Sequence, residues 1–157
     1  MDKKIVDRVE RMLNTFEDDK ARQETVYDTV YLYRDGPNKK RQVTLGRGFT
    51  SMGSNLWKVI QRYIDKGGRL SDFFKPYEDK MQLESLCDDK KFINNLIVAS
   101  RNETKMKEAQ DEIFEEVYLA GATKYFVSNG FKENLSFAVI VDSFLHSGSM
   151  LKFLTNS

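Results

Sequence analysis

Two acidic residues, Glu17 and Asp35, stand where their side chains can act as an acid and base pair. Glu17 follows Phe16 at the end of a predicted amphipathic helix, where apolar neighbours favour its protonated form. Asp35 precedes Gly36 and Pro37 in a predicted polar turn, which favours its ionised form. Hydrolysis of a glycosidic bond needs both states, because one carboxyl protonates the leaving oxygen while the other activates water.

The chain contains few residues that could support another catalytic mechanism. Cys87 is the single cysteine and His146 the single histidine, so neither an intramolecular disulfide nor a thiolate metal cluster can form. A Ser-His or Cys-His nucleophile would depend on His146 alone. We expect Cys87 to be a small core residue and His146 to lie at a helix end. We predict no metal and no organic cofactor.

Length and charge limit the class of protein further. The chain has 157 residues, 40% of them hydrophobic, which predicts one domain over residues 1–157, either a whole protein or a module of a longer one. The formal net charge of +1 argues against nucleic acid as a partner. No signal peptide or membrane-spanning stretch is recognisable, so we expect a soluble monomer that binds no membrane; its compartment stays open.

Hydrophobic periodicity predicts mostly helices. A change to β-branched and aromatic residues, followed by the turn at Asp35 to Asn38, predicts a hairpin or three-stranded sheet over residues 31–50. Ser54 is a candidate helix cap, and Gly67-Gly68 a helix stop. The segment 135–145 is almost continuously apolar and should be a helix buried on most sides. The predicted helices cover residues 3–17, 54–65, 71–77, 81–87, 92–100, 103–128 (interrupted near Gly121), 135–145 and 150–154.

Three segments around Asp35 resemble the catalytic region of the glycoside hydrolase family 46 chitosanases: residues 33–36 (YRDG), 43–50 (VTLGRGFT) and 53–56 (GSNL). Downstream, residues 109–110, 117–118, 137–138 and 142–148 resemble that family's later helices. The resemblance implies an α+β, mainly α, lysozyme-like domain with a small sheet inserted after the first helix. It covers most of the chain at low identity.

The resemblance also implies roles for particular residues. Glu17 would be the general acid, Asp35 the general base, and Thr44 the hydroxyl that helps hold the attacking water. Asn55 stands where the family has an acidic substrate-binding residue. The chain departs from the pattern by inserting residues 37–41 in place of a glycine-rich loop, and it ends soon after residue 148 whereas family members continue.

A second, weaker resemblance is to phage-type lysozymes, where a Thr-x-Gly-x-Gly stretch follows the catalytic residues. This chain has Phe49 where many of those enzymes have His. Tyr33 is a candidate for stacking on sugar rings, although alternate tyrosines on a strand often only pack the sheet. Five basic residues form a predicted basic lip that suits an anionic polymer such as peptidoglycan: Arg34, Lys39, Lys40, Arg41 and Arg47.

The leading interpretation is an endo-acting hydrolase of β-1,4-linked amino-sugar polysaccharide, chitosan or peptidoglycan, with Tyr33, Asn55 and Arg47 as substrate-binding candidates. Three alternatives remain open. The chain is a peptidoglycan-cleaving muramidase, or a lysozyme-like module that binds sugar without cutting it, or a protein-interaction domain that uses the fold as a scaffold.

Overall fold

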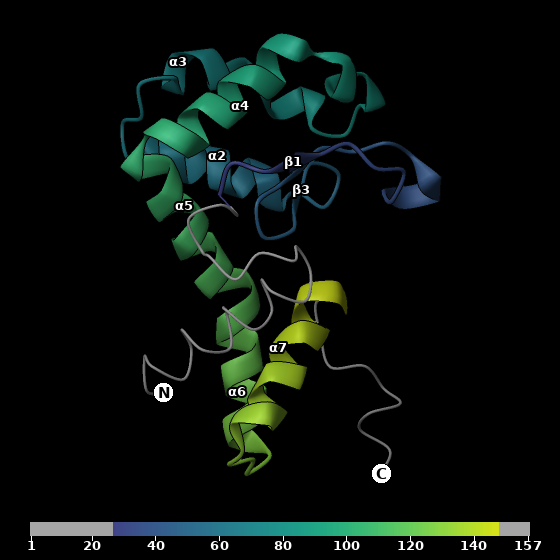
Figure 1. Ribbon diagram of the computed structural model, residues 1–157, viewed down its shortest axis with the longest axis vertical. Helices are drawn as coiled ribbons and strands as arrows, with labels where there is room; N and C mark the ends of the chain where they lie inside the picture. The colour runs from purple at the N-terminus through teal and green to yellow at the C-terminus, as the bar shows by residue number, and fades with distance from the viewer. Residues whose placement is uncertain (1–26, 148–157) are drawn as a thin grey trace. The chain divides into compact units, whose positions relative to one another are not determined.

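The computed structural model describes the backbone of residues 27–147 (Figure 1). The predicted helices at 3–17 and 150–154 lie outside these residues, and so does Glu17. The chain divides into two compact units, Glu24–Ile113 and a second unit described over residues 114–147. The elements confirm a mainly helical α+β fold with one small sheet. That the whole chain is one domain stays a prediction.

The sheet is antiparallel and has three short strands in the order β1-β2-β3. They are β1 (Val30–Tyr31), β2 (Thr44–Leu45) and β3 (Phe49–Thr50). Tyr31 pairs with Thr44, which in turn pairs with Thr50. The same pairing continues beyond these strands: Gln42 N donates to Tyr33 O at 3.0 Å, and Ser51 N donates to Val43 O at 2.8 Å. The predicted sheet over residues 31–50 is therefore confirmed.

One face of this sheet is part of the hydrophobic core. Val43, Leu45 and Phe49 share that face, since side chains alternate along a strand, and all three are 0% exposed. Helix α2 (Asn55–Asp65) packs against β3 and buries Leu56 and Ile60. The sheet is thus fixed from one side, and its other face is left to carry polar and aromatic side chains.

Helix α2 has the expected end, but its first residue is not capped as expected. Ser54 precedes it in a left-handed conformation (φ 65°) and its side chain makes no capping hydrogen bond, so the predicted serine cap is wrong. The stop at Gly67-Gly68 is confirmed: Gly67 has φ 67°, and Gly68 N donates to Tyr63 O at 3.1 Å. Glycine is favoured at Gly67 because this left-handed conformation strains other residues.

Tyr63 connects this turn to the start of a distant helix. Its ring is 0% exposed, and its hydroxyl donates to Glu103 Oε1 at 2.8 Å and accepts from Leu70 N at 2.9 Å. Burial, aided by the hydrogen bond to Glu103, raises the pKa of Tyr63 to about 12. Gly68 lies directly against the ring, because a Cβ built there would stand 2.0 Å from Tyr63 Cζ.

We expect Gly68→Ala to destabilise the protein by about 2–3 kcal/mol, because a ring held on two sides cannot make room for the methyl group. Urea unfolding measures the change. Gly67→Asn is the matched control, since asparagine tolerates the left-handed conformation and a Cβ at Gly67 would make only an ordinary contact, with Lys105 Nζ at 3.8 Å. A Gly68→Ala variant within about 0.5 kcal/mol of wild type, well below the usual overpacking cost, would contradict this reading of the packing.

Short helices and then a longer helix follow α2 along the chain. Helix α3 (Ser71–Phe74) continues into the 3₁₀ helix η3 (Lys75–Lys80), so the α-helical part of the predicted helix 71–77 ends before Pro76. The predicted helix 81–87 is wrong in extent, because only a 3₁₀ turn, η4 (Glu84–Asp88), forms there. Helix α4 (Lys90–Asn102) contains the predicted helix 92–100 and begins after Asp89, whose carboxylate accepts a hydrogen bond from Phe92 N at 2.9 Å. This bond lowers the pKa of Asp89. Cys87 is buried, as expected.

The predicted helix 103–128 consists of three pieces: α5 (Thr104–Phe114), a π-helical turn η5 (Glu115–Leu119) and α6 (Ala120–Ser128). The irregular part is therefore the π turn, and the interruption expected near Gly121 is misplaced. Gly121 instead allows close packing between α6 and α7 (Asn134–Ser147), since a Cβ there would stand 2.6 Å from the Phe144 ring. Helix α6 ends at Ser128, as predicted, and Asn129 follows as its C-cap.

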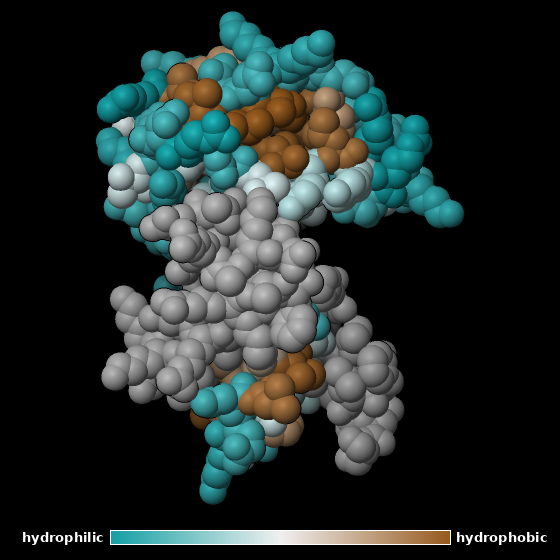
Figure 2. All heavy atoms as spheres, in the orientation of Figure 1, coloured by the Kyte–Doolittle hydropathy of each residue, from teal (hydrophilic) through white to brown (hydrophobic). Residues whose placement is uncertain are grey.

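Helix α7 is less buried than its apolar sequence indicates. Phe137, Ile140 and Val141 are buried, but Leu135 is 70% and Val139 46% exposed, so it is not enclosed on most sides. In the other unit the exposed large hydrophobic residues are Leu32, Tyr33, Leu83 and Val98. Figure 2 shows hydrophobic side chains gathered on one face of that unit and bordered by polar ones. Among the described helices, none has the length and hydrophobicity to cross a membrane.

Candidate active site

The polar face of the sheet gathers side chains from all three strands. Tyr31 stands opposite Thr44, and the continued pairing sets Tyr33 opposite Gln42. Thr50 stands opposite Thr44 on the remaining side. Because directly paired residues project to the same side of a sheet, these five residues share one face. We call this surface the polar sheet face, defined by Tyr31, Tyr33, Gln42, Thr44 and Thr50.

Asp35 lies in the connection between β1 and β2 and is exposed. This connection is folded on itself: Gly36 N donates to Lys40 O and Lys39 N donates to Gly36 O, both at 3.0 Å. A 3₁₀ turn (Pro37–Lys39) confirms the predicted turn chemistry. The Asp35 carboxylate accepts a hydrogen bond from Gln42 Nε2 at 3.1 Å, so the loop returns Asp35 to the edge of the polar sheet face.

The loop is also attached to the turn η4. Arg41 N donates to Glu84 Oε1 at 2.7 Å, and the Arg41 guanidinium makes a two-point contact with Asp88 at 3.1 and 2.6 Å. The hydrogen bonds from Arg41 lower the pKa of Asp88. The insertion 37–41 is therefore a structured loop with its own attachment.

Thr44 lies in the middle strand and is 9% exposed. Its Oγ1 is buried and has no hydrogen-bond partner among residues 27–147. A buried hydroxyl normally has a partner, because leaving it unpaired costs about 1–3 kcal/mol. An atom of this kind can take a hydrogen bond from a water or a substrate group.

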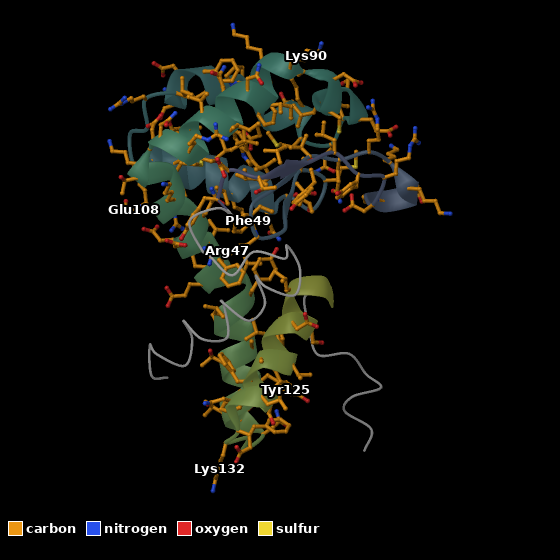
Figure 3. The ribbon with its side chains drawn as sticks, in the orientation of Figure 1. Arg47, Phe49, Lys90, Glu108, Tyr125 and Lys132 are labelled. Atoms are coloured by element: carbon orange, nitrogen blue, oxygen red, sulfur yellow. The ribbon has the colours of Figure 1, made fainter. Side chains whose placement is uncertain are left out.

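Arg47, predicted to bind substrate, has a side chain that is 4% exposed and forms an ion pair with Asp111 on α5. Asp111 Oδ1 also accepts from Tyr27 at 2.7 Å, and the guanidinium lies 5.4 Å from the centre of the Tyr27 ring. Figure 3 labels Arg47, which lies between β2 and β3, and Phe49, the first residue of β3. Arg47 therefore joins the sheet to α5, and a role in substrate binding stays a prediction.

The basic lip is weaker than the sequence indicates. Arg41 and Arg47 are each paired with an acidic residue, Asp88 and Asp111 respectively. Lys39 and Lys40 remain exposed, beside the negative charge of Asp35. Two of the five cations of the lip are therefore paired within the protein, which leaves less positive charge to select an anionic polymer.

The remaining predicted residues are placed as follows. Tyr33 is 60% exposed, and its ring stacks on Tyr31 with centroids 5.3 Å apart and an interplanar angle of 18°. Asn55 is partly buried at the first position of α2. Sequence reasoning missed Gln42, although its place two residues before Thr44 on a strand is the signal that finds it. Within the described part of the chain, no cluster of Asp, Glu, His and Cys is arranged to hold a metal.

Comparison with solved structures identifies the class of fold as lysozyme-like, close to that of the family 46 chitosanases. The native chitosanase of Bacillus subtilis MY002 superposes with a TM-score of 0.78 at 24% identity, covering 94% of this chain and 61% of that one. A family 46 chitosanase of Gynuella sunshinyii superposes with a TM-score of 0.77 at 21% identity, covering 94% of this chain and 60% of that one.

These similarities establish the fold. The chain spans about three fifths of the length of the chitosanases it matches. No protein-family model matches the sequence, and no curated protein does either.

Proposed function

We propose that this chain is a glycoside hydrolase that cuts β-1,4-linked amino-sugar polysaccharide, with chitosan as the first candidate substrate. The observation that carries the proposal is the polar sheet face, with an unpartnered Thr44 hydroxyl and an exposed Tyr33 ring, together with Asp35, which Gln42 holds at its edge. The similar structures support the substrate class, since they are chitosanases, one in complex with 6 GlcN and another with chitotetraose.

In the proposed reaction, Asp35 takes a proton from water while the water oxygen bonds to the anomeric carbon. The bond from that carbon to the leaving oxygen breaks, and Glu17 gives its proton to this oxygen. Thr44 Oγ1 accepts or donates a hydrogen bond that holds the water. Asp35 then returns its proton to solvent and Glu17 regains one, so charge and atoms balance over a turnover. The anomeric configuration is inverted.

Tyr33 and Asn55 are proposed to bind the sugar chain. Tyr33 offers an exposed ring face already held parallel to Tyr31, which lowers the entropy cost of stacking on a sugar. The pairing of Arg41 and Arg47 with acids leaves less positive charge to repel a cationic polymer. Chitosan is therefore favoured over peptidoglycan.

The test is a direct assay on both polymers. The purified chain is incubated with chitosan oligomers and, separately, with peptidoglycan; new chain ends are detected by mass spectrometry and the first anomer by NMR. We expect shorter chitosan oligomers with inverted configuration. Cleavage of peptidoglycan alone would identify a muramidase, and binding without new ends would identify a sugar-binding module. Either result would overturn the proposal.

A further inference from the structure

Gln42 is a buried polar residue beside the proposed base. It is 6% exposed, and its amide nitrogen lies 3.1 Å from Asp35 Oδ1. An ionised carboxylate only accepts hydrogen bonds, so the nitrogen of the amide must face Asp35. The amide oxygen Oε1 is then turned away, and it is buried with no hydrogen-bond partner among the described residues.

This arrangement is a poor one for stability alone. A buried amide whose oxygen is unpaired gains little over an apolar side chain of the same size. The surrounding loop nevertheless makes room for it: Gly36 is buried, and a Cβ at that position would meet Lys40 O at 2.8 Å, Met52 Sδ at 3.0 Å and Gln42 Cδ at 3.4 Å. The glycine thus lets the Gln42 side chain lie across the loop.

The backbone on both sides of the contact is fixed. Gln42 N donates to Tyr33 O, which keeps residue 42 in register with the sheet, and Arg41 is held by Glu84 and Asp88. Gln42 and Thr44 are two positions apart on the same strand and so lie on the same face. A rigid segment therefore carries both the amide that holds Asp35 and the hydroxyl proposed to hold water.

We propose that Gln42 is a positioning residue for the reaction: its amide fixes the orientation of the Asp35 carboxylate relative to Thr44. This inference rests on the proposed function. Gln42 holds one carboxylate oxygen, Oδ1, and leaves Oδ2 for the proton of the attacking water. The residue acts through Asp35 and need not touch the substrate.

The test compares variants by kcat and KM on chitosan oligomers. Gln42→Met keeps the length of a buried side chain but removes the donor; we expect kcat to fall about 10- to 100-fold, because a misplaced base loses most of its effect. KM should stay within about two-fold, since sugar binding is not altered. Gln42→Glu, which sets a second carboxylate against Asp35, should lose at least as much. Gln61→Met, the same exchange at an exposed position of α2, is the control.

A readout without turnover accompanies the kinetics. The side-chain amide protons of Gln42, followed by ¹H–¹⁵N NMR, should shift when Asp35 is changed to Ala and should not shift in an Asp79→Ala control. Unchanged kcat in Gln42→Met, or amide protons indifferent to Asp35, overturns the positioning role and leaves the hydrolase proposal in place. A wild-type protein that cuts neither polymer overturns both.

Discussion

The Glu17→Gln variant is expected to hydrolyse chitosan about two to four orders of magnitude more slowly than wild type, because an amide cannot donate the proton that the leaving oxygen needs. Binding should change little, since the two side chains have nearly the same shape, so the loss should appear in kcat. Initial rates of chain-end formation measure it.

The control for Glu17 is Glu10→Gln, which makes the same exchange in the same predicted helix. Glu10 belongs to the same predicted helix and has no proposed catalytic role, so its exchange should leave turnover within about two-fold of wild type. Near wild-type turnover in Glu17→Gln would eliminate Glu17 as the acid. Because Glu17 lies outside the described residues, this experiment is the direct evidence for its role.

The Asp35→Asn variant should lose a comparable two to four orders of magnitude in kcat, for the opposite reason: it cannot accept a proton from water. A second measurement separates a missing base from a damaged loop. Azide needs no deprotonation before it attacks the anomeric carbon, so added azide should restore bond cleavage in Asp35→Asn and yield a glycosyl azide of inverted configuration.

Asp79→Asn, an exchange at an exposed acid of η3, serves as the control for Asp35 and should behave as wild type. Turnover of Asp35→Asn within about three-fold of wild type, where a general base contributes at least a hundred-fold, would remove Asp35 from the mechanism. So would a glycosyl azide of retained configuration, because it would require an intermediate bonded to the protein.

Local sequence signals found most of the elements. The change from helical spacing to β-branched and aromatic residues located the sheet, and Gly67-Gly68 located the end of α2. These signals are reliable because backbone conformation and side-chain alternation depend on near neighbours. The errors occurred where a local signal was weak. Ser54 had the right residue type for a cap but a left-handed backbone, and segment 81–87 was too short for its pattern to choose a helix type.

The candidate site was predictable only in part. Asp35 and Thr44 could be named from a motif resemblance, and their roles stay predictions until they are tested. The partners of the nearby charges could not be named, because Arg41 meets Asp88 across 47 residues of sequence and Arg47 meets Asp111 across 64. From the sequence alone, both arginines would be expected to be able to bind an anionic substrate.

The sequence by itself determined the kinds of element, the turn that carries Asp35 and the alternation that puts Gln42 and Thr44 on one side of a strand. Tertiary structure alone decided that Gln42 bonds to Asp35, that two arginines are neutralised and that Thr44 is buried. The physical reason is range: backbone preferences act over a few residues, whereas burial and hydrogen-bond partners are set when distant segments pack together.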